Sequence, residues 1–240
     1  MGRDAETAAD VAAATAKLDA EGLLAYVAKR FAGRIALASS FGAEDQVVTD
    51  LLRKVAPEVP IFTLDTGRLP QETYDVIEAT REKYGVAIEM LCPDAAALEK
   101  LVRLHGPNLF RQSVELRREC CRVRKVEPLR RRLAPLDAWI CGLRREQAAT
   151  RTEVQRIEWD EGNGLVKINP LADWSTDQVW DYIRAHDVPY NRLHDAGYPS
   201  IGCAPCTRAV APGEDIRAGR WWWEAPEHKE CGLHTHNQHI

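Results

Sequence analysis

The chain lacks the apolar segments of membrane and secreted proteins. Its 240 residues contain no run of eighteen apolar residues, the length that indicates a membrane-spanning helix. Residues 1–6 contain none of the apolar stretch that belongs to a secretory signal peptide. We therefore expect no membrane span, no secretory signal and a cytoplasmic protein. The composition, 45% hydrophobic and 28% charged, is typical of a globular chain that can build one good core.

An excess of basic residues is also missing. The formal net charge is −4, so charge by itself gives no reason to expect a nucleic-acid partner. Two nucleotide-binding motifs are absent, the P-loop G-x-x-x-x-G-K-[ST] and the dinucleotide fingerprint G-x-G-x-x-G. Their absence counts against P-loop ATPases and against dinucleotide-dependent dehydrogenases.

Cysteine, by contrast, is plentiful. An odd number, seven, in a chain expected to be cytoplasmic favours metal or redox chemistry over a disulfide framework. Four of the seven form two pairs, the adjacent Cys120 and Cys121 and the C-x-x-C of Cys203 and Cys206. Four thiolates are the ligand set of a [4Fe–4S] cluster or of a structural zinc ion. Adjacent helix positions diverge by about 100°, so two neighbouring sulfurs reach one small ion poorly unless the helix distorts. This spacing favours iron–sulfur and leaves zinc open.

The other three cysteines have different surroundings. Cys92 and Cys141 lie in or next to predicted strands, and we expect both to be core residues. Cys231 lies in the polar run 224–240, close to His234. A nearby cation lowers the pKa of a thiol, so Cys231 is a candidate nucleophile. An unimportant tail thiol is the simpler alternative.

Basic residues crowd around the adjacent cysteines. A solvated helix face would explain them, and so would an anion site beside a negatively charged thiolate cluster. The two interpretations stay open. The residues are Arg117, Arg118, Arg122, Arg124, Lys125, Arg130, Arg131 and Arg132.

The order of predicted elements indicates an α/β fold, a mostly parallel sheet flanked by helices. Two segments around a Gly-containing turn predict a β-hairpin late in the chain. We expect a single domain over residues 1–223 and a flexible C-terminal tail over 224–240. The predicted strands are 35–38, 60–64, 87–91 and 138–143, the hairpin is 154–159 with 165–168, and the helices are 4–31, 47–55, 71–83, 94 onward, 114–129 and 176–185.

Polar loops follow three of the predicted strands, at residues 39–45, 65–70 and 144–151. In open parallel sheets, ligands bind outside the carboxyl ends of the strands. The first loop joins a strand to a helix through Ser and Gly, an arrangement whose backbone N–H groups can hold a phosphate. An ordinary strand–helix turn explains this loop equally well.

Six motifs occur in a fixed order along the chain. They are S-S-F-G-A-E-D at 39–45, L-D-T-G-R at 64–68, C-C-x-x-x-K at 120–125, G-L-R-R-x-Q-x-x-T-R at 142–151, C-x-x-C at 203–206 and E-C-G-L-H at 230–234. Together they resemble the assimilatory sulfonucleotide reductases, and within them the iron–sulfur adenylyl-sulfate reductases. The resemblance runs from about residue 35 to residue 234, and the adjacent cysteines and the E-C-G-L-H tail are its most specific parts.

The resemblance implies an adenine-nucleotide α-hydrolase-like fold and an enzyme of sulfate assimilation and cysteine biosynthesis. The implied reaction is the thioredoxin-dependent reduction of adenylyl sulfate (APS) to sulfite and AMP. The implied cofactor is a [4Fe–4S] cluster on Cys120, Cys121, Cys203 and Cys206, and the implied nucleophile is Cys231, which carries an S-sulfonate. Thioredoxin or a similar dithiol is the expected partner, with no nucleic acid and no membrane, and a homo-oligomer stays open. The implied substrate contacts are Ser39, Ser40, Phe41, Gly42, Asp45, Leu64, Thr66, Arg68, Lys125, Gly142, Arg151, Arg217, Arg220 and His234.

Three other functions remain. A phosphoadenylyl-sulfate (PAPS) reductase uses the same chemistry on a substrate with one more phosphate, which Glu44 and Asp45 would repel if they faced the ribose. An ATP-dependent adenylating or tRNA-thiolating enzyme shares the fold, but its S-G-G-x-D-S type of loop is replaced here by S-F-G-A-E-D. A zinc- or cluster-containing nucleic-acid-binding module would use the basic helix, and the net charge of −4 counts against it.

Overall fold

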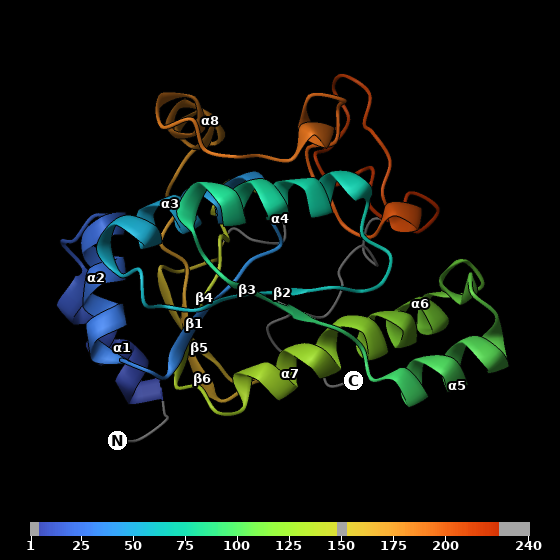
Figure 1. Cartoon of the computed structure of the whole chain (residues 1–240), viewed down its shortest axis with the longest axis horizontal. Helices are drawn as coiled ribbons and strands as arrows, with labels where there is room; N and C mark the ends of the chain where they lie inside the picture. The colour runs from blue at the N-terminus through green and yellow to red at the C-terminus, as the bar shows by residue number, and fades with distance from the viewer. Residues whose placement is uncertain (1–4, 148–152, 226–240) are drawn as a thin grey trace. The chain divides into compact units, whose positions relative to one another are not determined.

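The computed structural model describes residues 5–147 and 153–225, which divide into two compact units (Figure 1). Unit 1 consists of the described parts of Met1–Thr63, Glu72–Glu89 and Leu133–Asn191. Unit 2 consists of the described parts of Leu64–Gln71, Met90–Arg132 and Arg192–Ile240. The single domain over 1–223 stays a prediction, and residues 226–240 of the predicted tail lie outside the described residues.

The helices and strands follow one another along the chain in the predicted order. None of the helices in the two described ranges is long and apolar enough to cross a membrane. The helices are α1 (Ala5–Thr15), α2 (Ala20–Arg30), α3 (Ala43–Val55), α4 (Gln71–Tyr84), α5 (Ala95–His105), α6 (Val114–Cys121), α7 (Glu127–Leu133) and α8 (Thr176–Ala185). The strands are β1 (Ile35–Ala38), β2 (Ile61–Leu64), β3 (Ile88–Leu91), β4 (Ala138–Ile140), β5 (Ile157–Asp160) and β6 (Leu165–Ile168).

The strands form one six-stranded sheet in the order β3-β2-β1-β4-β6-β5. β1 pairs in parallel with β2 and β4, and β4 pairs in parallel with β6. β5 and β6 pair antiparallel, which confirms the predicted hairpin. Its first strand begins at Ile157 rather than at residue 154, because the Gln155 N–H donates to the Glu158 carboxylate at 2.8 Å instead of to a neighbouring strand. The mostly parallel α/β prediction is therefore confirmed.

The core of unit 1 joins α1, α2, α3 and α8 to the sheet, and α3 packs against both α2 and α8. Cys141 is buried beside this core and donates to Asn169 Oδ1 at 3.0 Å, as predicted for a core cysteine. Burial raises the pKa of Cys141 to about 12, so this thiol is unreactive at neutral pH. The same prediction was wrong for Cys92, which is exposed. Cys92 follows β3, a half-exposed strand at the end of the sheet, and the position of a strand within a sheet cannot be predicted from its own residues.

Unit 2 has a small core in which the cysteines take part. The Ser113 hydroxyl caps α6 by accepting a bond from Leu116 N at 3.2 Å, and α6 ends at Cys121. The next turn, Arg122–Val126, is π-helical before α7 continues the chain, whereas the sequence predicted one regular helix. Turns of this kind insert one extra residue and are frequent at functional sites. The buried core residues are Leu101, Leu109, Phe110, Cys120, Cys121, Val123, Cys203, Cys206 and Trp221.

Candidate active site

In unit 1, the carboxylate of Asp45 joins two of the predicted site loops. Its Oδ2 accepts bonds from the backbone N and the Oγ of Ser40, both at 2.6 Å, and its Oδ1 accepts a bond from Gly142 N at 2.8 Å. The loops follow β1 and β4, which are parallel neighbours, so their carboxyl ends meet at one edge of the sheet. Asp45 is only 8% exposed, so these bonds form away from water. A Cβ on Gly142 would lie 2.5 Å from Asp45 Oδ1, so this contact requires glycine.

The loop after β1 also bonds to itself. Phe41 N donates to Ser39 Oγ at 3.1 Å, and Gly42 N donates to Ser40 Oγ at 3.4 Å. Phe41 has a φ of 59°, a left-handed conformation that is rare for a bulky residue, and its buried ring packs with Val76 and Ile77. Gly42 precedes the first turn of α3, whose N–H groups can hold an anion.

Glu44 is engaged by an arginine of the second loop. Its Oε1 accepts bonds from Arg144 Nε at 3.0 Å and Nη2 at 2.7 Å, and Arg144 is buried. The carboxylate of Asp45 is likewise occupied by Ser40 and Gly142. The expected repulsion of a ribose phosphate required both carboxylates to face the ligand. Their bonds within the chain remove the basis of that argument.

An Asp45→Asn variant is expected to lower the free energy of unfolding by about 1 to 3 kcal/mol. The amide N–H₂ of asparagine would face a donor at either Ser40 or Gly142, which leaves a buried N–H without an acceptor. Urea denaturation measures the change. Asp94→Asn is the matched control, because Asp94 caps α5 through one exposed bond to Ala97 N and asparagine caps as well as aspartate. Equal stabilities for the two variants would contradict the role assigned to Asp45.

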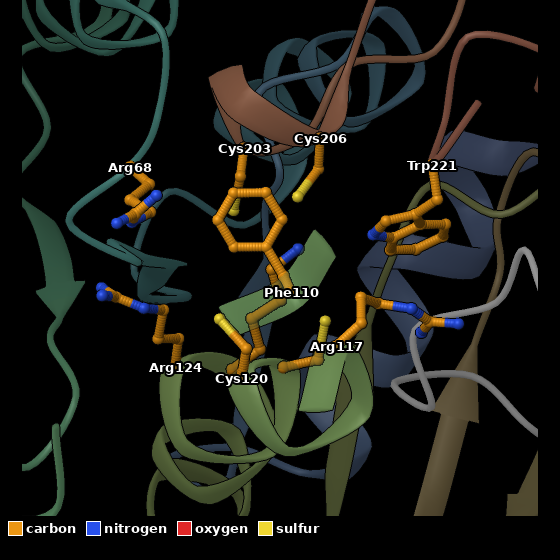
Figure 2. Close-up of a pocket in the computed structure, with 10 residues that line it drawn as sticks. Arg68, Phe110, Arg117, Cys120, Arg124, Cys203, Cys206 and Trp221 are labelled. Carbon is orange, nitrogen blue, oxygen red and sulfur yellow. The ribbon is translucent and has the colours of Figure 1, made fainter. Parts of the chain in front are cut away.

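In unit 2, the four predicted metal ligands line one cavity (Figure 2). Cys120 and Cys121 end α6, whereas more than eighty residues later Cys203 precedes a short 3₁₀ turn, Ala204–Cys206, and Cys206 ends it. Figure 2 shows the sulfurs of Cys120, Cys203 and Cys206 directed into the same space. All four side chains are buried. The remaining lining residues are Arg68, Phe110, Arg117, Arg124, Lys125 and Trp221.

Positive charge surrounds the four thiols. Burial by itself raises the pKa of Cys203, but Lys125, the Thr66 hydroxyl and two arginines outweigh it, so that this pKa falls below its usual value. Thr66 Oγ1 lies 3.2 Å from Cys203 Sγ. Burial raises the pKa of Cys206 to about 12 and also raises the pKa of Cys120. Cations close to a thiol stabilise its thiolate, the form that binds metal.

The donor set of the cavity fits an iron–sulfur cluster in its chemistry. Four thiols enclose one buried space whose walls also carry cations, as an anionic thiolate–metal group requires. The fit is one of donor chemistry and not of ligand geometry, because within residues 5–147 and 153–225 no group of three or more His, Cys, Asp and Glu side chains is arranged to hold a single metal ion.

The sequence left four lining residues of the cavity unassigned. Arg117 lies three residues before Cys120 and Arg124 three residues after Cys121, about one helical turn away. This spacing places both within about one turn of the cysteines, but Arg118 lies equally close to Cys121 and is not among the lining residues in the described part of unit 2, so the spacing by itself could not have selected them. Phe110 and Trp221 have no sequence signal, because they reach the cavity only through the tertiary fold.

The other predicted contacts are spread over unit 2. Leu64 is the last residue of β2, and Arg68 lines the cavity with its guanidinium 5.3 Å from the ring centre of Phe110. Arg220 is buried and donates from Nη1 to Ser200 Oγ at 3.2 Å and to the Ile201 carbonyl at 3.1 Å. Arg217 is half-buried and is not among the lining residues in the described part of unit 2. The predicted residues Arg151, Cys231 and His234 lie outside the described residues.

Two solved structures resemble this chain. Phosphoadenylyl-sulfate (PAPS) reductase from Candida auris matches with a TM-score of 0.71 and 28% identity, over 86% of this chain and 98% of that one. FMN adenylyltransferase from Candida glabrata matches with a TM-score of 0.55 and 15% identity, over 98% of this chain and 84% of that one. The second likeness concerns the fold alone. Both agree with the predicted adenine-nucleotide α-hydrolase-like fold.

Sequence comparison identifies a family. Residues 34–209 match the family described as the phosphoadenosine phosphosulfate reductase domain. The adenosine 5′-phosphosulfate reductase of Allochromatium vinosum is 58% identical over 200 residues, which cover 83% of this chain and 78% of that protein. Because the family match spans most of the chain and the relative is so similar, the chain belongs to the phosphoadenosine phosphosulfate reductase domain family.

Proposed function

We propose that the chain reduces adenylyl sulfate to sulfite and AMP, with thioredoxin or a similar dithiol as the reductant. The observation that carries the proposal is the cavity in which Cys120, Cys121, Cys203 and Cys206 meet among cations. The 58% identical relative is named for this substrate, which favours APS over PAPS. The more distant Candida auris structure is a PAPS reductase, which keeps PAPS as the second candidate.

The first step is a transfer of the sulfate group to Cys231. The Cys231 thiolate attacks the sulfur atom of the sulfate group, a sulfur–sulfur bond forms, and the bond from that sulfur to the bridging phosphate oxygen breaks. AMP leaves with the electron pair of the broken bond. Lys125, Arg217 and Arg220 neutralise the negative oxygens around the reacting sulfur, while His234 adds a further contact. The product is a Cys231 S-sulfonate.

The second step releases sulfite. A thiolate of the reductant attacks Cys231 Sγ, sulfite leaves with the electron pair of the sulfur–sulfur bond, and a mixed disulfide forms. The second thiol of the reductant displaces the Cys231 thiolate and becomes part of a disulfide. The dithiol therefore supplies both electrons and ends oxidised.

The nucleotide is proposed to bind at the loops of the sheet edge. In unit 1, the loop after β1 holds Ser39, Ser40, Phe41 and Gly42 in front of the first turn of α3. Its N–H groups suit the AMP phosphate. The carboxylate of Asp45 accepts bonds from Ser40 N and Gly142 N, so Asp45 supports the site by joining this loop to Gly142. Contacts to the nucleotide from Leu64, Thr66, Arg68 and Arg151 are proposed on the resemblance.

When bound by the four cysteines, a [4Fe–4S] cluster supplies negative charge and a cross-link within unit 2, and we propose that it passes no electrons. Lys125 lines the cavity and lowers the pKa of Cys203, so its ammonium group already lies in the field of the thiols. We therefore propose that Lys125 balances the negative charge of the cluster and of the substrate anion together. Mössbauer spectroscopy during turnover tests the point, because a change in iron oxidation state would refute it.

Protein purified without oxygen tests the reaction as a whole. Intact mass is measured after incubation with APS, and again after reduced thioredoxin is added. A gain of one SO₃ group on the Cys231 peptide, lost with thioredoxin, supports nucleophile, reaction and reductant together. An adduct from PAPS alone would change the substrate, and equal kcat/KM for both substrates would remove the preference for APS. Iron and sulfide analysis separates a cluster from zinc.

A Gly202→Ala variant is expected to form the S-sulfonate about 10²-fold more slowly, because a displacement of about 1 Å at a charged contact has an effect of this size. A Cβ on Gly202 would collide with the Arg220 guanidinium, whose Cζ would lie 2.6 Å away. The backbone of Gly202 is not in the left-handed region, so alanine acts through Arg220. Single-turnover mass analysis measures the rate. Gly162→Ala is the control, since its Cβ would meet only Asp160 Oδ1 at 3.5 Å. A normal rate for Gly202→Ala would contradict the role of Arg220.

A further inference from the structure

A buried ion pair lies where the described part of unit 2 ends. The guanidinium of Arg117, in α6, binds both carboxylate oxygens of Glu224, with Nε 3.1 Å from Oε1 and Nη2 2.8 Å from Oε2. The side chains are 0% and 4% exposed. Two parallel bonds of this kind fix the orientation of both groups, which a single-point ion pair would not do. The pair therefore fixes residue 224 relative to the helix that carries Cys120 and Cys121.

The turn that leads to Glu224 depends on the same arginine. Trp221 is buried and has a φ of 39°, and its indole contacts the guanidinium of Arg117 at 4.6 Å and that of Arg220 at 4.9 Å. Its backbone N donates to the Cys206 carbonyl at 3.1 Å, and Glu224 N donates to the Trp221 carbonyl at 2.8 Å. A tryptophan keeps a left-handed backbone only where several contacts enforce it. Arg117 supplies two of them, through the ring and through Glu224.

We propose that the Arg117–Glu224 pair anchors the start of the segment that carries Cys231, and that it ties this anchor to the cysteine cavity. Arg117 lines that cavity and binds Glu224, so one side chain connects both. Cys231 follows Glu224 by seven residues, which span at most about 25 Å when extended. When Glu224 is fixed, the Cys231 thiol stays within this distance of it. The effective concentration of the thiol at the substrate is then higher than it would be on an unanchored chain. Arg117 and Glu224 are positioning residues, and the inference rests on the proposed function of Cys231.

The kind of contact between Arg117 and Glu224, an ion pair, bears on its role. Apolar residues of similar volume stabilise a buried site as well as or better than such a pair. An apolar contact has no preferred direction, whereas the carboxylate of Glu224 meets the fork of Arg117 in one orientation. The geometry thus favours a role in aiming the chain beyond residue 224 over a role in stability alone.

Glu224→Gln removes the charge at constant size, and Glu214→Gln is its matched control. Glu214 likewise binds two nitrogens of one arginine, Arg208 Nη1 at 2.9 Å and Nη2 at 3.0 Å, but that pair is about one-third exposed. Three quantities are compared with the natural protein purified without oxygen. They are iron per chain, hydrogen–deuterium exchange of the amides of residues 218–225, and the single-turnover rate of S-sulfonate formation against APS concentration.

For Glu224→Gln we expect unchanged iron, exchange faster by about tenfold at Trp221 and Glu224, and S-sulfonate formation slower by about tenfold. The APS concentration at half-maximal rate should stay within about twofold, because the anchor positions the thiol and does not bind substrate. Glu214→Gln should match the natural protein. Glu224→Asp keeps the charge opposite Arg117 but reaches only one nitrogen, so its effects should be smaller and of the same kind.

The proposed anchor would be wrong if hydrogen–deuterium exchange were unchanged in Glu224→Gln, or if it became equally faster in Glu214→Gln. A raised half-saturating APS concentration with a normal maximal rate would also overturn it, because Glu224 would then act in substrate binding. If Glu224→Gln lost its iron, the exchange of Glu224→Asp would decide by the same criteria. Natural protein that forms no S-sulfonate from APS or PAPS would overturn the proposed function, while the exchange comparison, which needs no substrate, still decides the anchor.

Discussion

A Cys231→Ser variant is expected to form no S-sulfonate and to lose sulfite production by a factor on the order of 10⁴ or more. The serine hydroxyl is almost fully protonated at neutral pH, whereas a thiol close to cations is largely ionised and is intrinsically more nucleophilic. Iron content should remain normal, because Cys231 is not one of the four proposed ligands, Cys120, Cys121, Cys203 and Cys206. Intact-mass analysis after APS, together with a sulfite assay, measures both effects.

Cys92→Ser is the control for Cys231→Ser. Cys92 is an exposed cysteine remote in sequence from the cavity motifs, so its loss should leave adduct and sulfite formation within about twofold. An SO₃ adduct that persists in Cys231→Ser would assign the nucleophile to another residue. An adduct that disappears in Cys92→Ser would do the same.

A Cys203→Ser variant is expected to lose most of its bound iron and to destabilise unit 2 by roughly 5 kcal/mol or more. Cys203 belongs both to the proposed ligand set and to the small core of unit 2, so the free energy of cluster binding is expected to contribute to the folding of that unit. Iron and sulfide analysis measures the first effect. Limited proteolysis measures the second, with cleavage appearing in Met90–Arg132 before it appears in the core segments of unit 1.

Cys141→Ser is the matched control, because Cys141 is a buried cysteine of unit 1 that faces Asn169. Its replacement should leave the iron content unchanged and lower the free energy of unfolding by about 1 to 2 kcal/mol. Removal of iron with a chelator should reproduce the proteolysis pattern of Cys203→Ser. Full iron in Cys203→Ser would contradict the proposed ligand set.

Much of the fold follows from local patterns. Short apolar strands between helical segments were sufficient to predict the parallel sheet, and the predicted helix over 176–185 is α8 (Thr176–Ala185). The π-helical turn at Arg122–Val126 was missed, because apolar spacing cannot distinguish it from a regular helix. Cys92 was misjudged because its exposure depends on β3 being at the end of the sheet.

The α/β class, the two cysteine pairs and the family could all be predicted from which chemical groups the chain contains and how they are spaced. Such properties depend on neighbouring residues, which a pattern can record. The bonds of the Asp45 carboxylate to Ser40 and Gly142, and the pairing of Arg117 with Glu224 across 107 positions, could not be predicted in this way. Contacts of that separation arise from how whole elements pack, and no local spacing encodes them.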